Sequence, residues 1–346
     1  METYIGDINM KTEIIKVNPN NIDISRVKKA ASVIKSGGLV AFPTETVYGL
    51  GADALNDKAV AKIFEAKKRP LGDPLIVHIS KKEDLFKLAK EISNTAMELI
   101  GKFWPGPLTV VLNKSDIVPY IVTAGLDTVA IRMPANQIAL TLIKEAQTPI
   151  SAPSANLFSR PSPTTSQHVL DDLEGKVDLI IDGGKTDIGL ESTILDLTQD
   201  VPSVLRPGGV SMEKLQGVIK TIHLFKSQDK IFSPGMYPRH YSPKAKVILV
   251  DENDRIGVEK VRKLAYDFIL QGYSVGIIAK EENKEKYSEF NVKSLGPGDD
   301  LIKCAANLFS ILRDFDRFGV DVIISESVKE EELGLAIMDR LRKAAG

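Results

Sequence analysis

The sequence predicts an α/β protein of two domains, because short apolar runs alternate with helical patterns and one proline-rich stretch interrupts them. The chain has 346 residues, of which 43% are hydrophobic and 26% are charged. A chain of this length favours two domains, each large enough to bury its own core. We expect a larger domain over residues 1–225, a linker over 226–244 and a smaller domain over 245–346.

The first predicted domain combines helices with many short strands, which is typical of a mixed sheet. Residues 24–35 have helical apolar spacing and end at two glycines, and residues 57–68 form a second helix that stops before Pro70. One or two further helices are expected within 83–103. The apolar runs predicted as strands are 39–42, 75–79, 108–112, 129–133, 149–152, 179–182, 193–197 and 203–205.

The linker and the second domain differ in sequence pattern from the first domain. Prolines and glycines between 233 and 243 break any regular pattern, with Tyr237, His240 and Tyr241 between them. A βα repeat follows and predicts a small, doubly wound, Rossmann-like parallel sheet. Its expected strands are 246–250, 274–279 and 320–325, and its expected helices are 258–270, 301–315 and one that begins at 331.

Composition excludes several classes of protein. A formal net charge of -1 argues against binding nucleic acid through an overall positive field. The one cysteine, Cys304, excludes a disulfide framework and a cysteine zinc site within the chain, and we expect it to be a small buried residue. The four histidines are scattered, so no metal site is predicted. No signal peptide and no apolar run of the ~20 residues that span a bilayer is visible, so we expect a soluble, cytoplasmic protein with no membrane partner.

Two segments near the first strands could bind a ligand. Residues 43–51 place hydroxyls, a carboxylate and glycines after a strand, where ligands of open α/β sheets commonly bind, although an ordinary turn is an equal alternative. Lys67 and Arg69 end the second helix and could clamp neighbouring phosphates. Basic residues at a helix C-terminus are also favoured by the helix dipole and often simply face solvent.

Further polar residues follow later strands. His78 should point inward or into a cleft, and a hydrogen-bonded core histidine is the alternative role. Arg132 ends an apolar strand and needs a partner, either a ligand carboxylate or an internal acid. Residues 151–156 offer small hydroxyls and amides suited to an anion, and 191–193 and 206–208 could belong to the same site. Each of these three segments could also be a plain turn.

Taken together, these segments resemble the YrdC-type threonylcarbamoyl-AMP synthases in their order and spacing over about 200 residues. The matching segments are 43–51, 67–70, His78, 104–109, 129–134, 151–156, 191–193 and 206–208. The linker from Pro234 to Pro243 and the second domain resemble the long, two-domain form. The resemblance implies a YrdC-like open, twisted mixed sheet with flanking helices, followed by the Rossmann-like domain.

The resemblance also implies a reaction and a set of residue roles. L-threonine, bicarbonate and ATP would give threonylcarbamoyl-AMP and pyrophosphate, for the t6A modification of tRNA. Mg²⁺ would bridge the phosphates, and Lys67 and Arg69 would be the catalytic cations. The expected ATP residues are Lys67, Arg69, Asp73, Thr128, Ala152, Ser154, Asn156, Ser162 and Arg206. The expected threonine residues are Thr46, His78, Arg132 and Ser192, and Tyr237, His240 and Tyr241 would form a lid.

The expected partners follow from this reaction, and two alternative functions remain. The small-molecule substrates and a downstream threonylcarbamoyl transferase are the expected partners, with at most weak tRNA contact. One alternative is a carbamoyltransferase of hydrogenase maturation, which shares a similar domain but is much longer and cysteine-rich. The other is a non-catalytic RNA-binding or ribosome-maturation factor. The near-neutral charge and the lack of an aromatic-plus-basic motif weaken that alternative.

Overall fold

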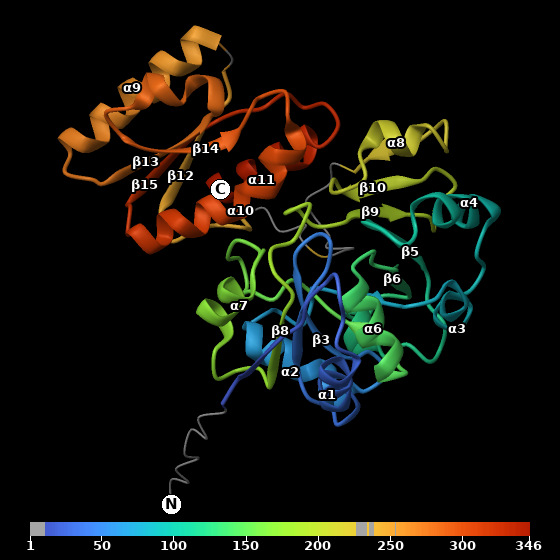
Figure 1. Ribbon diagram of the computed structural model, residues 1–346. Coiled ribbons are helices and arrows are strands. Elements are labelled where there is room, and N and C mark those ends of the chain that lie inside the picture. Colours follow the sequence, from blue (N-terminus) through green and yellow to red (C-terminus); the bar gives the residue numbers. More distant parts are fainter. Residues whose placement is uncertain (1–10, 226–233, 235–238, 253) are drawn as a thin grey trace, which may run out of the picture.

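Two sheets divide the chain into two modules, which lie side by side in the computed structural model (Figure 1). The structure describes residues 11–225, 234, 239–252 and 254–346. We call residues 11–225, with the eleven-stranded sheet, the N-terminal module, and residues 246–346, with the four-stranded sheet, the C-terminal module. The predicted α/β class, with one mixed and one parallel sheet, is confirmed.

The sheet of the N-terminal module is mixed and has the strand order β1-β8-β2-β3-β7-β4-β6-β5-β9-β10-β11. Both parallel and antiparallel neighbours occur in it, for example β4 parallel to β6 and β6 antiparallel to β5. The strands are β1 Glu13–Lys16, β2 Val40–Pro43, β3 Tyr48–Asp53, β4 Ile76–His78, β5 Leu108–Asn113, β6 Thr128–Arg132, β7 Ile150–Ser151, β8 Leu179–Asp182, β9 Thr193–Asp196, β10 Ser203–Arg206 and β11 His223–Leu224.

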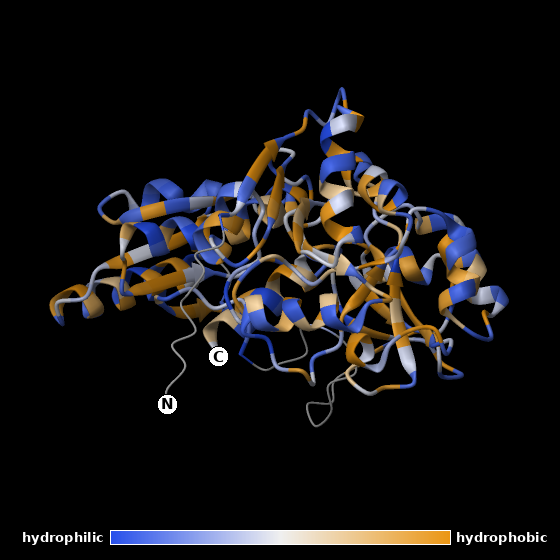
Figure 2. Cartoon of the chain, turned by 90° about the horizontal axis from the view of Figure 1, so that it is seen from below, coloured by the Kyte–Doolittle hydropathy of each residue, from blue (hydrophilic) through white to orange (hydrophobic). Residues whose placement is uncertain are grey.

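Helices cover both faces of this sheet, and their apolar stripes form two separate cores. Residues of α2 and α4 pack in one core, and residues of α1 and α6 pack in the other. Figure 2 shows the apolar strands enclosed by helices whose outer sides are hydrophilic. The helices are α1 Ile24–Lys35, α2 Asp57–Lys67, α3 Leu85–Leu88, α4 Asn94–Phe103, α5 Tyr120–Thr123, α6 Gln137–Ala146, α7 Ser166–Leu173 and α8 Met212–Gln216, with a 3₁₀ turn η1 at Lys82–Asp84.

Local sequence signals explain where several of these helices begin. The side chains of Asp23, Asn56, Ser93, Asn136 and Thr165 each accept a hydrogen bond from a backbone N–H of the first turn that follows. Such caps satisfy amides that have no partner inside the helix. The helices predicted over 24–35 and 57–68 are therefore confirmed, with α2 ending one residue earlier than expected.

The strand β3 was not predicted, and it changes the interpretation of residues 43–51. The segment is a short turn followed by a six-residue strand that pairs antiparallel with β2. Its glycines allow this close pairing: a Cβ built on Gly51 would lie 2.7 Å from side-chain atoms of both Phe42 and Ile150. The expected turn is thus confined to residues 44–47, and the glycines belong to the strand.

The C-terminal module is a doubly wound parallel sheet, as predicted. Its strand order is β12-β15-β13-β14, with α9 packed on one face and α10 and α11 on the other. Cys304 of α10 is fully buried, as expected. The elements are β12 Lys246–Val250, α9 Asp254–Leu270, β13 Val275–Lys280, η2 Glu281–Tyr287, β14 Asn291–Gly296, α10 Leu301–Phe318, β15 Val322–Glu326 and α11 Gly334–Ala345.

The two modules share an apolar core and a set of ion pairs across their contact. Val47 and Leu190 of the N-terminal module belong to the same buried cluster as the apolar faces of α10 and α11. Beside it, Arg313 of α10 forms a 2.7 Å ion pair with Asp172 of α7, and both side chains are buried. Arg313 also donates hydrogen bonds to the backbone oxygens of Pro161 and His168. The contact therefore combines a shared apolar core with buried, directional polar contacts.

The buried pair of Arg313 should contribute far more to stability than the exposed pair beside it. Replacing Arg313 with Met leaves Asp172 without its nearest cation, so the free energy of unfolding should fall by about 3 kcal/mol. The control is Arg317→Met, which breaks the 48%/33% exposed pair with Asp171 and should cost less than about 1 kcal/mol. Urea unfolding of both variants measures this, and equal losses would contradict it.

Candidate active site

Neighbouring strand ends place the predicted site residues along one edge of the large sheet. β4 and β6 run parallel, so His78 and Arg132, the last residues of these strands, lie directly opposite each other. Arg132 is also opposite Thr109 of β5, whose hydroxyl is 2.8 Å from that of Ser192, just before β9. Strand pairing therefore gathers residues that are up to 114 positions apart in sequence, from His78 to Ser192.

The turn between β2 and β3 delivers Thr46 to this edge. The Thr44 hydroxyl donates to the backbone oxygen of Val47 at 2.6 Å and accepts from the amides of residues 46 and 47. This hydroxyl-capped turn fixes the conformation of the segment. Arg132 then donates from Nη2 to the Thr46 hydroxyl at 3.0 Å and lies 2.7 Å from a carboxylate oxygen of Glu45. The internal acid expected for Arg132 is thus Glu45.

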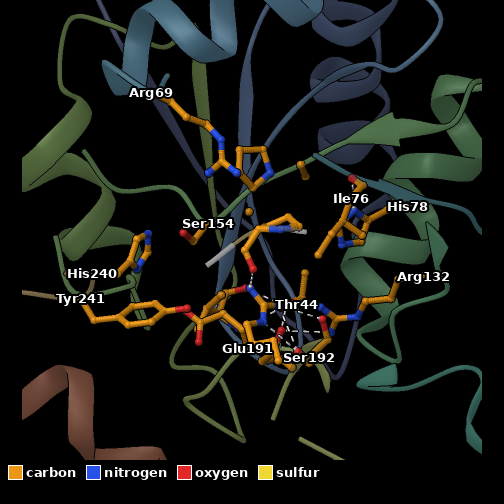
Figure 3. Close-up of a pocket in the computed structure, with 17 residues that line it drawn as sticks. Thr44, Arg69, Ile76, His78, Arg132, Ser154, Glu191, Ser192, His240 and Tyr241 are labelled. Atoms are coloured by element: carbon orange, nitrogen blue, oxygen red, sulfur yellow. Dashed lines mark hydrogen bonds between the residues drawn. The ribbon is translucent and has the colours of Figure 1, made fainter. Parts of the chain in front are cut away.

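One pocket collects most of the predicted residues, and Figure 3 shows their side chains converging on it. Arg69 approaches from one side, His78 and Arg132 from another, and His240 and Tyr241 from the segment between the modules. Arg206 donates to the backbone oxygen of Ser192 at 3.0 Å and to that of Pro234 at 3.3 Å. The predicted residues among its lining are Thr46, Arg69, His78, Arg132, Ala152, Ser154, Ser192, Arg206, His240 and Tyr241.

Lys67 does not line this pocket, although we expected it to meet the phosphates directly. Its ammonium is buried behind the wall and donates to the backbone oxygens of Ser154 and Asn156. Burial, together with the nearby charge of Arg69, holds the pKa of Lys67 well below its usual value. In this position Lys67 supports the 154–156 loop, and its contact with the pocket is indirect.

Asp73, Asn156 and Ser162 also lie immediately behind the lining. Asp73 is 2.8 Å from Nη2 of Arg69, and both side chains are almost completely buried. Burial raises the pKa of Asp73 despite that arginine. Asn156 donates to two loop carbonyls, and the Ser162 hydroxyl donates to Glu191. Asp73 and Ser162 thus contact lining residues, whereas the side chain of Asn156 bonds within its own loop.

Thr128 is a further predicted residue that does not line the pocket. It begins β6, at the opposite end of that strand from Arg132. Its expected contact with ATP therefore has no support from the position of the strand. Tyr237 of the predicted lid lies outside the described residues.

The sequence did not single out Glu45, and it gave no specific role to Glu191. Glu45 was one residue of a motif, yet it is buried and pairs with Arg132. Glu191 lines the pocket and pairs with Arg340 of α11 at 2.9 Å. A signal for both was present, since a buried arginine requires a carboxylate, but the sequence could not say which one.

The electrostatics of the pocket favour anions. Burial, and then the neighbouring Arg132, lower the pKa of His78 to about 3, so this imidazole is neutral at physiological pH. Burial also lowers the pKa of His240, with Arg69 and Lys67 adding to the effect. Neutral histidines leave the arginines as the charged groups of the lining that would meet an anion.

Within the residues that the structure describes, no group of three or more His, Cys, Asp or Glu side chains could hold a metal ion. In the same residues, no helix combines the length and the apolar character required to cross a bilayer.

Comparison with known families accounts for the chain from residue 32 to its last residue. A family model described as "Telomere recombination" (Sua5_yciO_yrdC) matches residues 32–208, and one described as "Threonylcarbamoyl-AMP synthase, C-terminal domain" matches 210–346. The chain is 50% identical to the threonylcarbamoyl-AMP synthase of Pyrococcus abyssi, an alignment that covers 97% of this chain and 98% of the relative. The chain belongs to the threonylcarbamoyl-AMP synthase family. The synthase of Bacillus subtilis is 46% identical over 93% of both chains.

Solved structures agree with this family. The crystal structure of Pyrococcus abyssi Sua5 complexed with L-threonine matches with a TM-score of 0.92 and 49% identity, covering 97% of this chain and 98% of that one. The structure of Escherichia coli YciO matches with a TM-score of 0.52 and 27% identity, covering 57% of this chain and 96% of that one. The synthase family thus shares both modules with this chain, whereas YciO matches over little more than half of it.

The neutral state of His78 makes folding sensitive to acid. Its pKa is lower in the folded chain than in the unfolded one, so between pH 6.5 and about 3 the unfolded chain binds a proton that the folded chain does not. At pH 5 this should cost about 2 kcal/mol of stability relative to neutral pH. His78→Gln should therefore lose less stability than the unaltered chain between pH 7 and pH 5, as measured by urea unfolding. Equal losses in both proteins would contradict the assignment.

Proposed function

We propose that this chain is a threonylcarbamoyl-AMP synthase, which condenses L-threonine, bicarbonate and ATP into threonylcarbamoyl-AMP and pyrophosphate. One observation carries the proposal: one pocket has Arg132, Thr46 and Ser192 on one wall and Arg69, Ser154 and Arg206 on a second wall. The family match over both modules supports it and does not favour the two alternatives. The product would supply the t6A modification of tRNA.

Arg132 is the group we propose for the threonine carboxylate. Within the described residues, its contacts to Gly106, Thr46 and Glu45 use Nε and Nη2. The two N–H groups of Nη1 are then available to a ligand, and the guanidinium is already held in place. Thr46, Ser192 and the neutral His78 would meet the polar groups of the amino acid. Such a fixed cation beside hydroxyls suits a small zwitterion with a hydroxyl side chain.

Arg69 and Arg206 are the cations we propose for the phosphates of ATP. Both are buried and line the pocket, as do Ser154 and Ala152. Lys67 would act through the 154–156 loop that it holds, and Asp73 and Ser162 through Arg69 and Glu191. The ATP role of Asn156 is likewise proposed as indirect.

The proposed reaction mainly requires the protein to position its substrates and to neutralise their negative charge. The amine of threonine would attack bicarbonate and release water to give a carbamate, whose oxygen would then attack the α-phosphorus of ATP as pyrophosphate leaves. Holding the two anions side by side and neutralising the charge that develops are the largest contributions a protein makes to such a step. The carboxylates nearest the phosphate wall, Asp73 and Glu191, are paired with arginines. The described residues therefore do not form a Mg²⁺ site, and any Mg²⁺ would enter bound to ATP phosphates.

The segment between the modules would have to move for the substrates to enter. The cavity volume is only ≈ 40 Å³, whereas small-molecule sites commonly enclose about 300–1,000 Å³. His240 and Tyr241 line it, and Tyr241 packs on Phe309 of α10 with ring centroids 5.4 Å apart. We therefore propose these two residues, with Tyr237, as a lid that closes over bound substrates.

The remaining parts of the proposal concern organisation and partners. We propose domain limits of 1–225 and 245–346, with 226–244 as the linker, since β11 still pairs with the first sheet and β12 begins the second. A threonylcarbamoyl transferase would consume the product, and tRNA contact by this chain would be weak. The cytoplasm is the expected compartment, because ATP and the tRNA substrate of the pathway are there.

The proposed reaction is tested by measuring pyrophosphate release from ATP. Release should require both L-threonine and bicarbonate, and the product should carry threonine and AMP in one molecule when analysed by mass spectrometry. The control is the same protein without bicarbonate. Pyrophosphate release that does not depend on threonine, or no release at all, would contradict the synthase function and favour a binding protein.

The proposed phosphate wall predicts a loss of activity for two cations that differ in position. Arg69→Ala removes a cation that lines the pocket, and Lys67→Ala removes the ammonium that holds the 154–156 loop. Each should lower kcat/KM for ATP by at least ~100-fold, the scale for one lost electrostatic contact in a transition state. Lys58→Ala, on the exposed start of the same helix, serves as the control and should be unchanged. Near-normal turnover in both test variants would contradict the assignment of these cations to phosphate binding.

A further inference from the structure

Arg340 is an unusual residue to find buried in a helix that flanks the sheet of a Rossmann-like module. It lies in α11, is completely buried and is the largest of the fully buried side chains. Its apolar neighbours on the helix, Ile337 and Leu341, pack in the core shared by the modules. Burying a guanidinium is costly unless it is paired, so its partners should reveal its role.

Those partners belong to the pocket. Nε of Arg340 donates to Oε2 of Glu191 at 2.9 Å, across 149 positions of sequence. The guanidinium carbon lies 5.1 Å from the centroid of the Tyr241 ring, a cation–π distance. Glu191 and Tyr241 both line the pocket (Figure 3). Nη1 is held by the adjacent Asp339 at 2.6 Å, which fixes the orientation of the group.

Glu191 connects Arg340 to the wall we assign to ATP. Its other oxygen, Oε1, accepts a hydrogen bond from Ser162, and Arg206 is near enough for its charge to act on the carboxylate. Burial alone would raise the pKa of Glu191, but the charges of Arg340 and Arg206 outweigh it and hold this pKa below its usual value. The carboxylate thus stays ionised with a cation on each side. Without Arg340, Arg206 would be its main counter-charge.

Simple docking of the modules does not account for this arrangement. Arg313 also crosses the contact and is also buried, but its partners are Asp172 and the backbone oxygens of Pro161 and His168. None of these three residues lines the pocket. Arg313 therefore contacts residues away from the pocket, whereas Arg340 contacts two residues that line it.

We propose that Arg340 is a positioning residue by which the C-terminal module completes the nucleotide-binding wall. It fixes Glu191, and through Glu191 it sets Ser162. Because Arg340 offsets the charge of Glu191, the charge of Arg206, whose guanidinium is held by Ser192 and Pro234, can act on an anionic ligand. It also holds the Tyr241 ring at the pocket. This inference rests on the proposed function only in taking the anionic ligand to be ATP.

Ligand binding tests the proposal without requiring turnover. Affinities for a non-hydrolysable ATP analogue and for L-threonine are measured separately by calorimetry, in the unaltered chain and in Arg340→Gln. The analogue should bind about 10-fold more weakly, the size of one charge-assisted hydrogen bond, while threonine affinity changes by less than about two-fold. Arg340→Lys, which keeps the charge, should recover part of the loss.

Matched variants separate positioning from a general structural effect. Arg313→Lys perturbs the same contact away from the pocket and should leave both affinities unchanged. Since Arg340 is proposed to act through Glu191, adding Arg340→Gln to Glu191→Gln should weaken analogue binding little beyond Glu191→Gln alone. Equal loss of both ligands in Arg340→Gln, an equal effect of Arg313→Lys, or full additivity would overturn the proposal.

Failure of the proposed role of Arg340 can be told apart from failure of the proposed synthase function. If the unaltered chain binds the analogue but releases no pyrophosphate, the synthase function fails while the comparison of Arg340 variants still decides the positioning role. If the unaltered chain does not bind the analogue, both proposals fail together.

Discussion

The pairing of buried arginines is the constraint on which the pocket depends. Arg69, Arg132, Arg206 and Arg340 are all almost completely excluded from solvent. An unpaired buried guanidinium is strongly destabilising, so each must be matched by carboxylates or carbonyl groups of the fold. Asp73 matches Arg69, Glu45 matches Arg132, Glu191 matches Arg340, and the backbone oxygen of Ser192 accepts from Arg206. The cations that would bind a ligand are thereby held rigid before it arrives.

This constraint explains why the two modules share a core. Arg313 and Arg340 of the C-terminal module each pair with a buried carboxylate of the N-terminal module, Asp172 and Glu191. The apolar side chains around them exclude water and strengthen both pairs. The contact between the modules is consequently part of the electrostatics of the site, and a family in which both modules match over nearly the full chain is consistent with that dependence.

Local patterns in the sequence were enough for most of the fold but not for the contacts within the site. Helices α1 and α2 carry clear periodicity and end signals, so their positions could be predicted. Strand β3 was missed because its glycines hide any alternation, and both of its faces are buried by packing that appears only in the tertiary structure. The helix α6 was also not predicted, although its cap at Asn136 and its apolar stripe could have been recognised in the sequence.

For the site, the sequence motifs predicted most of the lining, because strand ends of one sheet edge converge whatever their separation in sequence. The roles of Glu45 and Arg340, and the inward position of Lys67, were beyond reach for a different reason. An ion pair between residues 191 and 340 depends on how two modules dock, and nothing in the local sequence encodes that distance.

The charges of the site and the size of the cavity lead to the same physical picture. The side chains that line the pocket include three cations, Arg69, Arg132 and Arg206, and one carboxylate, Glu191. An anionic ligand that reaches these guanidinium groups would interact favourably with their charges in a low-dielectric interior. The volume of ≈ 40 Å³ leaves no room for that ligand while His240 and Tyr241 line the cavity. With the lid proposed above, binding would couple two events, the displacement of His240 and Tyr241 and the neutralisation of the arginines by the ligand. The favourable charge interaction of the second event would offset the lost packing of the first.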